Sequence, residues 1–529
     1  MPGIVEEKEP SARVGFTAPI LASNILVDSE LIEYGSDQRD MYRMGRKVEL
    51  RRTFSLHSVI GFSMILNSSW IFTLVTGTYT LSNGGLAGTI WMFVITAVGM
   101  FTVMLSMAEL ASITPSSGAQ YHWTSEYAPH RCHKFLSFTV GWLATLGWMA
   151  AMILVCYVCG QQVQSLIFLY HPTYIPAEWQ SSMLTVGFAI LAVAVNILLV
   201  RKLPLIEGAV FALYIAGFLF VLVVLWVMGE RRTAAAVFTD FENDNGWPTM
   251  VLACLVNISS PVITLVGSDS SCHLSEEMRN AGWGVPRAMI STALLSYSLG
   301  LIMEITFLFN VGNIQAATNS PFGQSYVAVI YSATGSRPAT AFCVAMITFL
   351  MCMCAVNQTT TASRQVYAFA RDNGLPFSSW LCSIREGLDF PLNAVLATLI
   401  LSLVVSLVTL SSNNVFNIIN TLTLGGLTCS YLIALIVVLW RKISTPDKFP
   451  VGKFIMGRKV ALLINMVAVS FLIIVVIFSN FPSEIHPSAY TMNWSTVAWA
   501  CCALGFVLYY RFRARHTYTS PIERTRKHD

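Results

Sequence analysis

The sequence predicts an all-α integral membrane protein with twelve transmembrane helices. Of its 529 residues, 55% are hydrophobic and only 11% are charged, and the mean hydropathy is +0.61. These values lie far outside the range of ordinary soluble domains. The formal net charge of +4 is small and the basic residues are scattered among loops. The expected partner is therefore the lipid bilayer, and nucleic-acid binding is not expected.

Twelve apolar runs are long enough to cross about 30 Å of hydrocarbon, which takes roughly 20 helical residues. They cover residues 54–81, 86–113, 135–169, 179–200, 205–228, 248–267, 286–311, 338–363, 391–410, 415–440, 460–481 and 490–510. The chain then divides into a tail (1–53), five spans (54–228), a loop (229–247), five spans (248–440), a loop (441–459), two spans (460–510) and a tail (511–529).

Basic residues are distributed very unevenly between the two sides that these spans define. One side holds 29 of the 32 Lys and Arg residues, and the other holds only Arg231, Arg232 and Arg337. Positively charged loops stay in the cytoplasm. Both tails and loop 441–459 are therefore predicted to be cytoplasmic, and loop 229–247 to be extracellular. The N-terminal tail lacks the pattern of a cleaved signal peptide.

The sixth predicted span is interrupted twice by small and polar residues. Its apolar run breaks at 258–261, resumes, and breaks again at 267–271. Unsatisfied backbone groups are costly in hydrocarbon, so unwound helix is tolerated there only where it lines a cavity. A broken helix at membrane depth is therefore typical of a substrate site.

The first predicted span carries a matching interruption at Asn67, Ser68 and Ser69. Spans one and six hold corresponding places in two successive groups of five. Because each group has an odd number of spans, the two groups enter the membrane from opposite sides, as in inverted-topology repeats. We expect a small-molecule substrate to bind between the two breaks. The alternative is that these polar residues only bond to neighbouring helices.

Ionisable residues within spans are rare and are candidates for function. Glu304 lies deepest and is the best candidate for a proton-linked carboxylate, although a structural hydrogen bond between helices is an alternative. Glu109 and Glu207 lie near the cytoplasmic ends of their spans, where structural or gating roles are favoured. Asp269 is predicted to cap the helix that resumes at Ser270.

No catalytic pattern is apparent in the sequence. The histidines of one loop, His122, His130 and His133, lack further residues at metal-ligand spacing, and the glycine-rich segment 83–88 precedes a span instead of following a strand. We therefore expect neither an enzyme nor a bound metal or cofactor. An ion gradient, of protons or of sodium, would drive transport.

Three groups of motifs resemble a known family. They are ELAS (109–112) with PSSGAQYHW (115–123), GSD (267–269) with SEEMRN (275–280) and Pro286, and SRQVYAFARDNGLP (363–376). Together they resemble the amino acid–polyamine–organocation superfamily, and within it the fungal amino acid/choline transporter family, which includes GABA and choline permeases. The resemblance implies a leucine-transporter-like fold with a five-plus-five inverted repeat and two extra helices. It also implies secondary active uptake at the plasma membrane, usually proton-coupled in fungi.

The family's substrate contacts map to the two breaks. The implied residues are Asn67, Ser68, Ser69 and Trp70 at the first break and Ile263, Thr264, Leu265 and Gly267 at the second. Many relatives have a glycine-rich first break and aromatic residues at the second. This chain departs from both patterns, so the resemblance does not specify the substrate.

The resemblance also leaves the coupling ion open. Some proton-coupled relatives place a Lys of span five against the first break, where this chain has Tyr214. Thr359, Thr360 and Ser363 of span eight could offer hydroxyls to a sodium ion. The favoured alternative is that they form hydrogen bonds between helices.

The chemistry of the breaks narrows the ligand. A half-helix N-terminus suits a carboxylate and unwound carbonyls suit an ammonium group, which together fit a zwitterion. A quaternary ammonium would need an aromatic cage, for which Trp70, Trp142, Trp148 and Tyr157 are available. The leading hypothesis is a proton-coupled permease for a small amino acid, a GABA-like compound or a choline-like amine. The alternatives are a transporter of a specialised metabolite such as an alkaloid, and a nutrient sensor, which the short tails disfavour.

Overall fold

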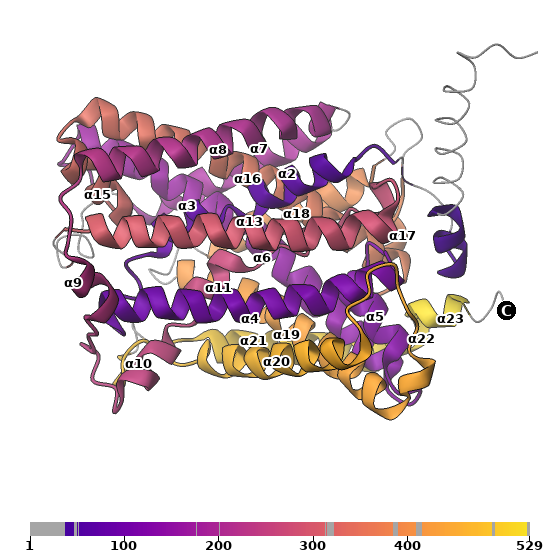
Figure 1. Ribbon diagram of the computed structural model, residues 1–529. Coiled ribbons are helices and arrows are strands. Elements are labelled where there is room, and N and C mark those ends of the chain that lie inside the picture. The colour runs from indigo at the N-terminus through magenta and orange to yellow at the C-terminus, as the bar shows by residue number, and fades with distance from the viewer. Residues whose placement is uncertain are drawn as a thin grey trace, which may run out of the picture.

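The computed structural model describes residues 37–525 except 47–49, 51, 176, 200–201, 313, 315–321, 385–389, 409–414 and 489–491. Its regular structure is a bundle of helices (Figure 1). In this described part, nine helices are long and apolar enough to cross a membrane. The prediction of an all-helical, multi-pass membrane protein is confirmed. Most of the predicted N-terminal tail, with Arg201 and Arg385 of the charge pattern, lies outside the described residues.

The nine long spans begin with a broken pair and continue as single helices. They are α2–α3 (Leu56–Asn67 and Ser69–Thr76), α4 (Gly85–Ile113), α6 (His133–Tyr170), α7 (Glu178–Leu199), α8 (Leu203–Met228), α13 (Ala281–Asn310), α16 (Arg337–Arg371), α19 (Val415–Ser444) and α20 (Arg458–Phe478). The other three predicted spans correspond to shorter helices, namely α10 (Met250–Val256) with α11 (Ser259–Leu265), α18 (Leu392–Val408) and α21 (Ser495–Tyr509). The total of twelve spans stays a prediction.

Short helices fill the connections. They include α5 (Ala119–Tyr127), α9 (Ala234–Thr239), α12 (Ser270–His273), the 3-10 turn η2 (Ser275–Glu277), α15 (Ser325–Thr334), α17 (Ser378–Leu381), η4 (Pro446–Lys448), and a π-helical turn η5 (Tyr510–Ala514) followed by α22 (Arg515–Thr517) and α23 (Pro521–Thr525). The segment before α4 and the segment after α9 are paired, because the backbone N–H of Gly84 donates to the carbonyl oxygen of Glu242 at 2.7 Å.

The central helix of the bundle is α6, which packs against both α16 and α19. Glycines allow the close approach to α19, since a Cβ atom on Gly426 would lie 2.7 Å from the Cα atom of Gly147. Small residues at helix crossings are typical of membrane bundles. By contrast, α7 and α8 present exposed apolar side chains such as Leu198, Leu205 and Val227. Such a surface is suited to lipid.

Both ends of the described chain lie at the same end of the bundle (Figure 1). Arg46 pairs there with Asp372, and the backbone N–H of Thr519 donates to the carbonyl oxygen of Asp372 at 3.0 Å. We call this the Asp372 end. The opposite end, which carries α9, α10 and α15, is called the Asn83 end.

Candidate functional site

The helix is interrupted in both spans in which the sequence indicated a break. In span six, the break expected at 258–261 lies slightly earlier, at Asn257 and Ile258 between α10 (Met250–Val256) and α11, because Ser259, Ser260 and Pro261 form the first turn of α11. Helix α2 ends at Asn67, Ser68 has a left-handed backbone with φ of 42°, and α3 begins at Ser69. In the second broken segment, α11 ends at Leu265 and α12 begins at Ser270. A left-handed non-glycine residue such as Ser68 is strained, and such strain is retained mainly at functional sites.

The two broken segments lie side by side and run in opposite directions. Three side-chain contacts join them, Ser270 Oγ to Ser63 Oγ at 3.0 Å, Asn67 Nδ2 to the Val266 carbonyl oxygen at 3.3 Å, and Thr76 Oγ1 to Thr264 Oγ1 at 3.4 Å. The middle contact joins the two breaks to each other. The breaks therefore form one structural unit near the centre of the bundle.

A small cavity of about 20 Å³ lies between the breaks. Of the residues expected at the breaks, Asn67, Ile263 and Gly267 line it, and its polar side chains also include Trp148 of α6 and Gln358 of α16. Its volume is that of a site holding little more than one water molecule. The site is thus nearly closed in this conformation.

Three buried polar atoms around this cavity have no hydrogen-bond partner among the described residues. They are the Asn67 Oδ1 and Gln358 Oε1 acceptors and the Trp148 Nε1 donor. Buried polar atoms are nearly always paired, so a group of three unpaired atoms needs an explanation. A polar ligand that accepts one hydrogen bond and donates two would satisfy all three.

Two of the other predicted residues bond to backbone. Ser68 donates to the carbonyl oxygen of Ile65, within its own turn, and Ser69 donates to the carbonyl oxygen of Ser296 in α13. Their hydroxyls stabilise the break and its neighbour. Their positions agree with the alternative in which these residues bond to helices.

The remaining predicted residues point away from the cavity. The Trp70 ring packs on α8, with its centroid 5.7 Å from that of Tyr214 and 6.1 Å from that of Phe218. Tyr214 therefore contacts the first break, as expected. Leu265 is buried in the apolar core, and Thr264 lines a second cavity, described below.

The four aromatic residues considered for a cage have different neighbours. Trp148 lines the cavity, whereas Trp70 packs on α8. Trp142 donates to the carbonyl oxygen of Gly374 at 3.2 Å, and Tyr157 accepts from Gln161 at 2.9 Å. These positions do not form a shared aromatic cage for a quaternary ammonium group.

The hydroxyls proposed for sodium all have protein partners. Thr359 donates to the carbonyl oxygen of Ala355 at 2.8 Å, and Ser363 donates to that of Thr360 at 2.8 Å. Thr360 donates to Asn196 Oδ1 of α7 at 2.6 Å. Only the Thr360 bond joins two helices, as in the helix-to-helix alternative, whereas the bonds of Thr359 and Ser363 lie within α16.

The predicted helix cap at Asp269 is wrong. Asp269 occupies the N-cap position of α12, but its side chain forms no cap hydrogen bond. Its carboxylate instead accepts from Gln120 of α5 at 2.6 Å and from Tyr431 of α19 at 2.6 Å. The reason is tertiary, because two stronger donors reach the carboxylate from elements distant in sequence. Glu109 pairs with Lys442 at 2.6 Å, in agreement with a structural role.

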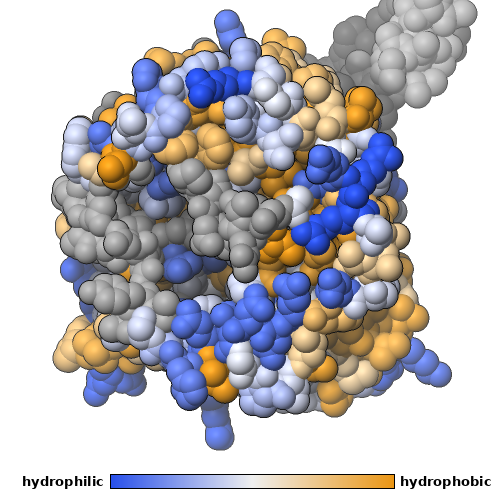
Figure 2. Space-filling model, turned by 90° about the vertical axis from the view of Figure 1, so that its left-hand side faces the viewer, coloured by the Kyte–Doolittle hydropathy of each residue, from blue (hydrophilic) through white to orange (hydrophobic). Residues whose placement is uncertain are grey.

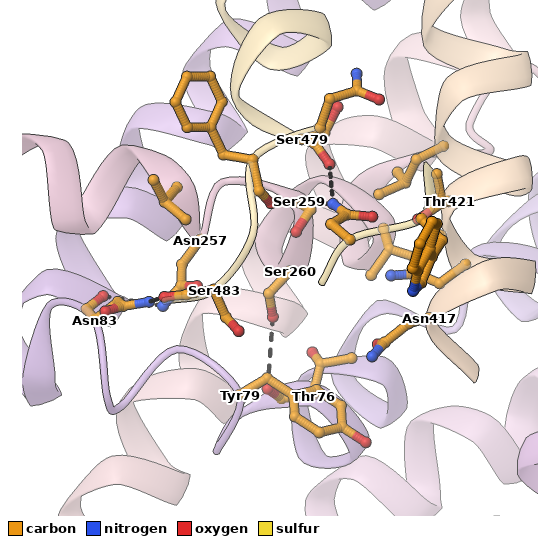
Figure 3. Close-up of a pocket in the computed structure, with 18 of the residues that line it drawn as sticks. Thr76, Tyr79, Asn83, Asn257, Ser259, Ser260, Asn417, Thr421, Ser479 and Ser483 are labelled. Atoms are coloured by element: carbon orange, nitrogen blue, oxygen red, sulfur yellow. Dashed lines mark hydrogen bonds between the residues drawn. The ribbon is translucent and has the colours of Figure 1, made fainter. Parts of the chain in front are cut away.

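A larger cavity of about 380 Å³ opens at the Asn83 end. Its walls are rich in Asn, Ser and Thr, and Asn83, Asn257 and Asn417 surround this space in Figure 3. Figure 2 looks onto the same end and shows clusters of hydrophilic side chains on it. Ile263 lines both this vestibule and the small cavity between the breaks. The vestibule therefore leads toward the breaks.

The sequence profile of the amino acid permease family matches residues 53–504. The chain belongs to this family. It is a transporter and not an enzyme, and the resemblance noted from its motifs is confirmed.

The permease is similar along nearly its whole length to several proteins with known names. It is 27% identical to the GABA-specific permease of Saccharomyces cerevisiae, with 92% of this chain and 86% of that protein covered. It is 25% identical to the choline transporter of the same yeast, with 89% and 83% covered. An amino-acid permease of Arabidopsis thaliana is 27% identical, with 92% and 96% covered.

At the Asp372 end the permease is closed by a buried network of charges. Arg46 lies 3.3 Å from Glu276 and 3.0 Å from Asp372, and Arg371 lies 2.7 Å from Glu276. Tyr121 of α5 donates to Asp372 at 2.9 Å. Burial opposes ionisation of Glu276, but Arg371 and Arg46 outweigh it and lower the pKa of Glu276 to about 2. We call these five residues the charge network.

The motifs that identified the family meet in this region. Segment 115–123 supplies Tyr121, segment 275–280 supplies Glu276, and segment 363–376 supplies Arg371 and Asp372. Sequence reasoning used these segments only for recognition and missed their contact. The available signal was the presence of opposite charges at the ends of apolar runs.

Gln358 is the other residue that sequence reasoning missed. It follows Asn357 where the apolar part of span 338–363 ends, directly before three threonines, and a polar pair there could have indicated it. Asn357 has a structural partner, because it donates to Glu207 Oε2 of α8 at 3.0 Å. Gln358 alone of the pair lines the cavity between the breaks.

Proposed function

We propose that this permease imports a small zwitterionic amino acid or a GABA-like amine together with a proton. The substrate binds between the breaks at Asn67 and Gly267, and the vestibule admits it from the Asn83 end. The observation that carries this proposal is the group of three unpaired polar atoms around the central cavity.

These three atoms match the two ends of a zwitterion. The amide oxygens of Asn67 and Gln358 are acceptors suited to an ammonium group, and the indole N–H of Trp148 is a donor suited to a carboxylate. Helix α3 begins at the first break, so its leading backbone N–H groups add positive potential for the carboxylate. The relatives' names, GABA-specific permease and choline transporter, agree with an amine. The absence of a shared cage at the four aromatic positions considered above favours the zwitterion over choline.

The two ends of the bundle differ as alternating access requires. The vestibule opens at the Asn83 end, while the charge network closes the Asp372 end. The excess of basic residues on that side supports a cytoplasmic location for the Asp372 end. In this proposal the structure is an outward-facing state of a plasma-membrane importer, with a nearly closed site between the breaks. Rocking of the broken helices would open the charge network and close the vestibule.

Uptake into proteoliposomes tests the proposal. The purified permease would be offered radiolabelled GABA, choline and each of the twenty protein amino acids, with the outside made acid and with or without a protonophore. We expect accumulation of at least one zwitterion, and we expect the protonophore to abolish it. Empty liposomes are the control. If no compound of this panel accumulates above the control, the proposal is contradicted.

A further inference from the structure

A second small cavity, of about 10 Å³, is lined by Glu304. Glu304 lies in α13 and is 4% exposed. The cavity is lined by hydroxyl-bearing residues of α3, α4 and α11 and of the turn between α3 and α4, namely Thr76, Thr80, Thr89, Ser260 and Thr264, with Gly77, Phe93 and Pro261. Among the described residues, Glu304 accepts no hydrogen bond and has no ion-pair partner.

Among the described residues, no charged group lines this cavity to balance the charge of the carboxylate. The elements that line the cavity, α3, α4 and α11, place no charged or titratable side chain in its wall. Helices α2, α8, α9, α12 and α15 and the turn η2 also pack along α13, and their described residues add nothing to the lining. An unpaired carboxylate is costly in such surroundings, whereas the neutral acid is tolerated. Proton binding at Glu304 is therefore favoured by its surroundings.

The Glu304 cavity adjoins the vestibule. Thr76 and Ser260 line both spaces, and in Figure 3 their side chains lie close together at the edge of the vestibule. The Ser260 hydroxyl lies 3.5 Å from the carbonyl oxygen of Thr76. Hydroxyl groups both donate and accept hydrogen bonds, so they can pass a proton between water in the vestibule and a carboxyl group.

The same two half-helices also border the substrate cavity. In α3, Phe72 lines the substrate cavity and Thr76 lines the Glu304 cavity. In α11, Ile263 lines the substrate cavity and Thr264 lines the Glu304 cavity. A change in charge at Glu304 therefore acts on the elements that form the substrate site. Two sites that bias one mobile element are coupled energetically.

We propose that Glu304 is the site that binds the coupling proton, loaded from the vestibule and carried with the substrate as α3 and α11 move. This inference rests on the proposed function. Protonation removes the uncompensated charge and lets α3 and α11 close the vestibule over the substrate. Release of the proton on the other side resets the empty permease.

The substitution Glu304→Gln distinguishes proton coupling from substrate transport itself. Glutamine resembles the neutral, protonated form of glutamate in shape and charge, but it binds no proton. The test compares wild type, Glu304→Gln and Glu207→Gln in proteoliposomes, using the panel compound that wild type accumulates most. Glu207 is the matched control, since it is equally buried but already accepts a hydrogen bond from Asn357. Two rates are measured, accumulation driven by a pH gradient and exchange with preloaded compound at equal pH.

Each pH unit supports tenfold accumulation at one proton per substrate, so a gradient of about two units drives about a hundredfold accumulation in wild type. We expect no net accumulation by Glu304→Gln, with a ratio of inside to outside compound of about one, while its rate of exchange stays within about twofold of wild type. Glu207→Gln should resemble wild type. Gradient-driven accumulation by Glu304→Gln equal to wild type would overturn the inference, and so would a variant that still binds the compound but does not exchange it.

A second measurement tests Glu304 even if the Glu304→Gln variant does not fold or if wild type shows no uptake of the panel compounds. Dicyclohexylcarbodiimide adds to a protonated carboxyl group, and the adduct rearranges to a stable N-acylurea from which nothing leaves. Peptide mass mapping of labelled wild type should find this adduct at Glu304, more at about pH 6 than at about pH 8. An adduct at Glu304 without measurable uptake would contradict the proposed function alone. Absence of a pH-dependent adduct at Glu304 would overturn the inference.

Discussion

The Nδ2 atom of Asn67 lies 3.3 Å from the carbonyl oxygen of Val266, across two broken helices and 199 residues of sequence. The same amide nitrogen reaches the carbonyl oxygen of Leu265 at 3.4 Å and Ser268 Oγ at 3.2 Å. One side chain therefore satisfies groups that the second break leaves unpaired, while its own Oδ1 has no partner among the described residues. The amide joins the two breaks, and in the proposed function its Oδ1 is an acceptor for the ligand.

Replacement of Asn67 by Leu should destabilise the ligand-free protein. Leu has a similar volume but leaves the carbonyl groups of the second break without a donor, which costs roughly 1–3 kcal/mol. Thermal unfolding of the purified protein should show a lower melting temperature. Asn465→Leu is the matched control, because the Asn465 amide in α20 is buried with no partner among the described residues. That control should melt at or above the wild-type temperature, and equal melting of both variants would contradict the role of Asn67.

Removal of Arg46 should favour opening at the Asp372 end. Arg46 contacts Glu276 and Asp372 at once, and loss of one partner of a buried ion pair costs roughly 3–5 kcal/mol. In Arg46→Met, Cys272 of α12, which is buried in the closed protein, should react faster with an aqueous maleimide. Peptide mass mapping measures this rate. Arg458→Met removes an exposed pair with Asp447 and is the control. Equal Cys272 reactivity in wild type and Arg46→Met would show that the network does not close this end.

The charge network should be insensitive to pH in the physiological range. The pKa of Glu276 is lowered to about 2, so its contribution is fully present above the ordinary glutamate range and is lost only as the pH falls toward about 2. The difference in melting temperature between wild type and Glu276→Gln should therefore be constant from about pH 5 to about pH 8. If this difference in melting temperature changes between about pH 5 and about pH 8, the charge network itself responds to pH in this range. If the difference is constant, the pH dependence of transport has to come from other groups, of which Glu304 is the first candidate.

The breaks could be predicted from sequence because their signals are local. Clustered polar residues at 67–69 and a glycine at 267 interrupt apolar runs at membrane depth, which favours an unwound helix beside a cavity. The direction in which each side chain points could not be predicted in the same way. Neighbouring helical residues point about 100° apart, so a run such as 67–70 includes some residues that face the cavity and others, like Trp70, that face α8.

The tertiary partners were beyond local reasoning for the same reason. Asp269 looks like a helix cap in sequence, and its donors Gln120 and Tyr431 come from α5 and α19. Gln358 lies more than ninety positions from the second break, and only the fold brings it to the cavity. Glu304 was identified because a carboxylate inside an apolar span is conspicuous by itself.

The most direct test of the substrate site is the affinity of Trp148→Phe for the compound that stabilises wild type most among GABA, choline and the amino acids. The Trp148 N–H has no partner among the described residues, so its loss should leave the ligand-free melting temperature unchanged and weaken ligand affinity about tenfold, the worth of one hydrogen bond. Trp123→Phe, which loses a bond of 3.0 Å to the carbonyl oxygen of Thr114, should show the reverse, with lower stability and unchanged affinity. Unchanged affinity in Trp148→Phe would contradict a substrate site between the breaks.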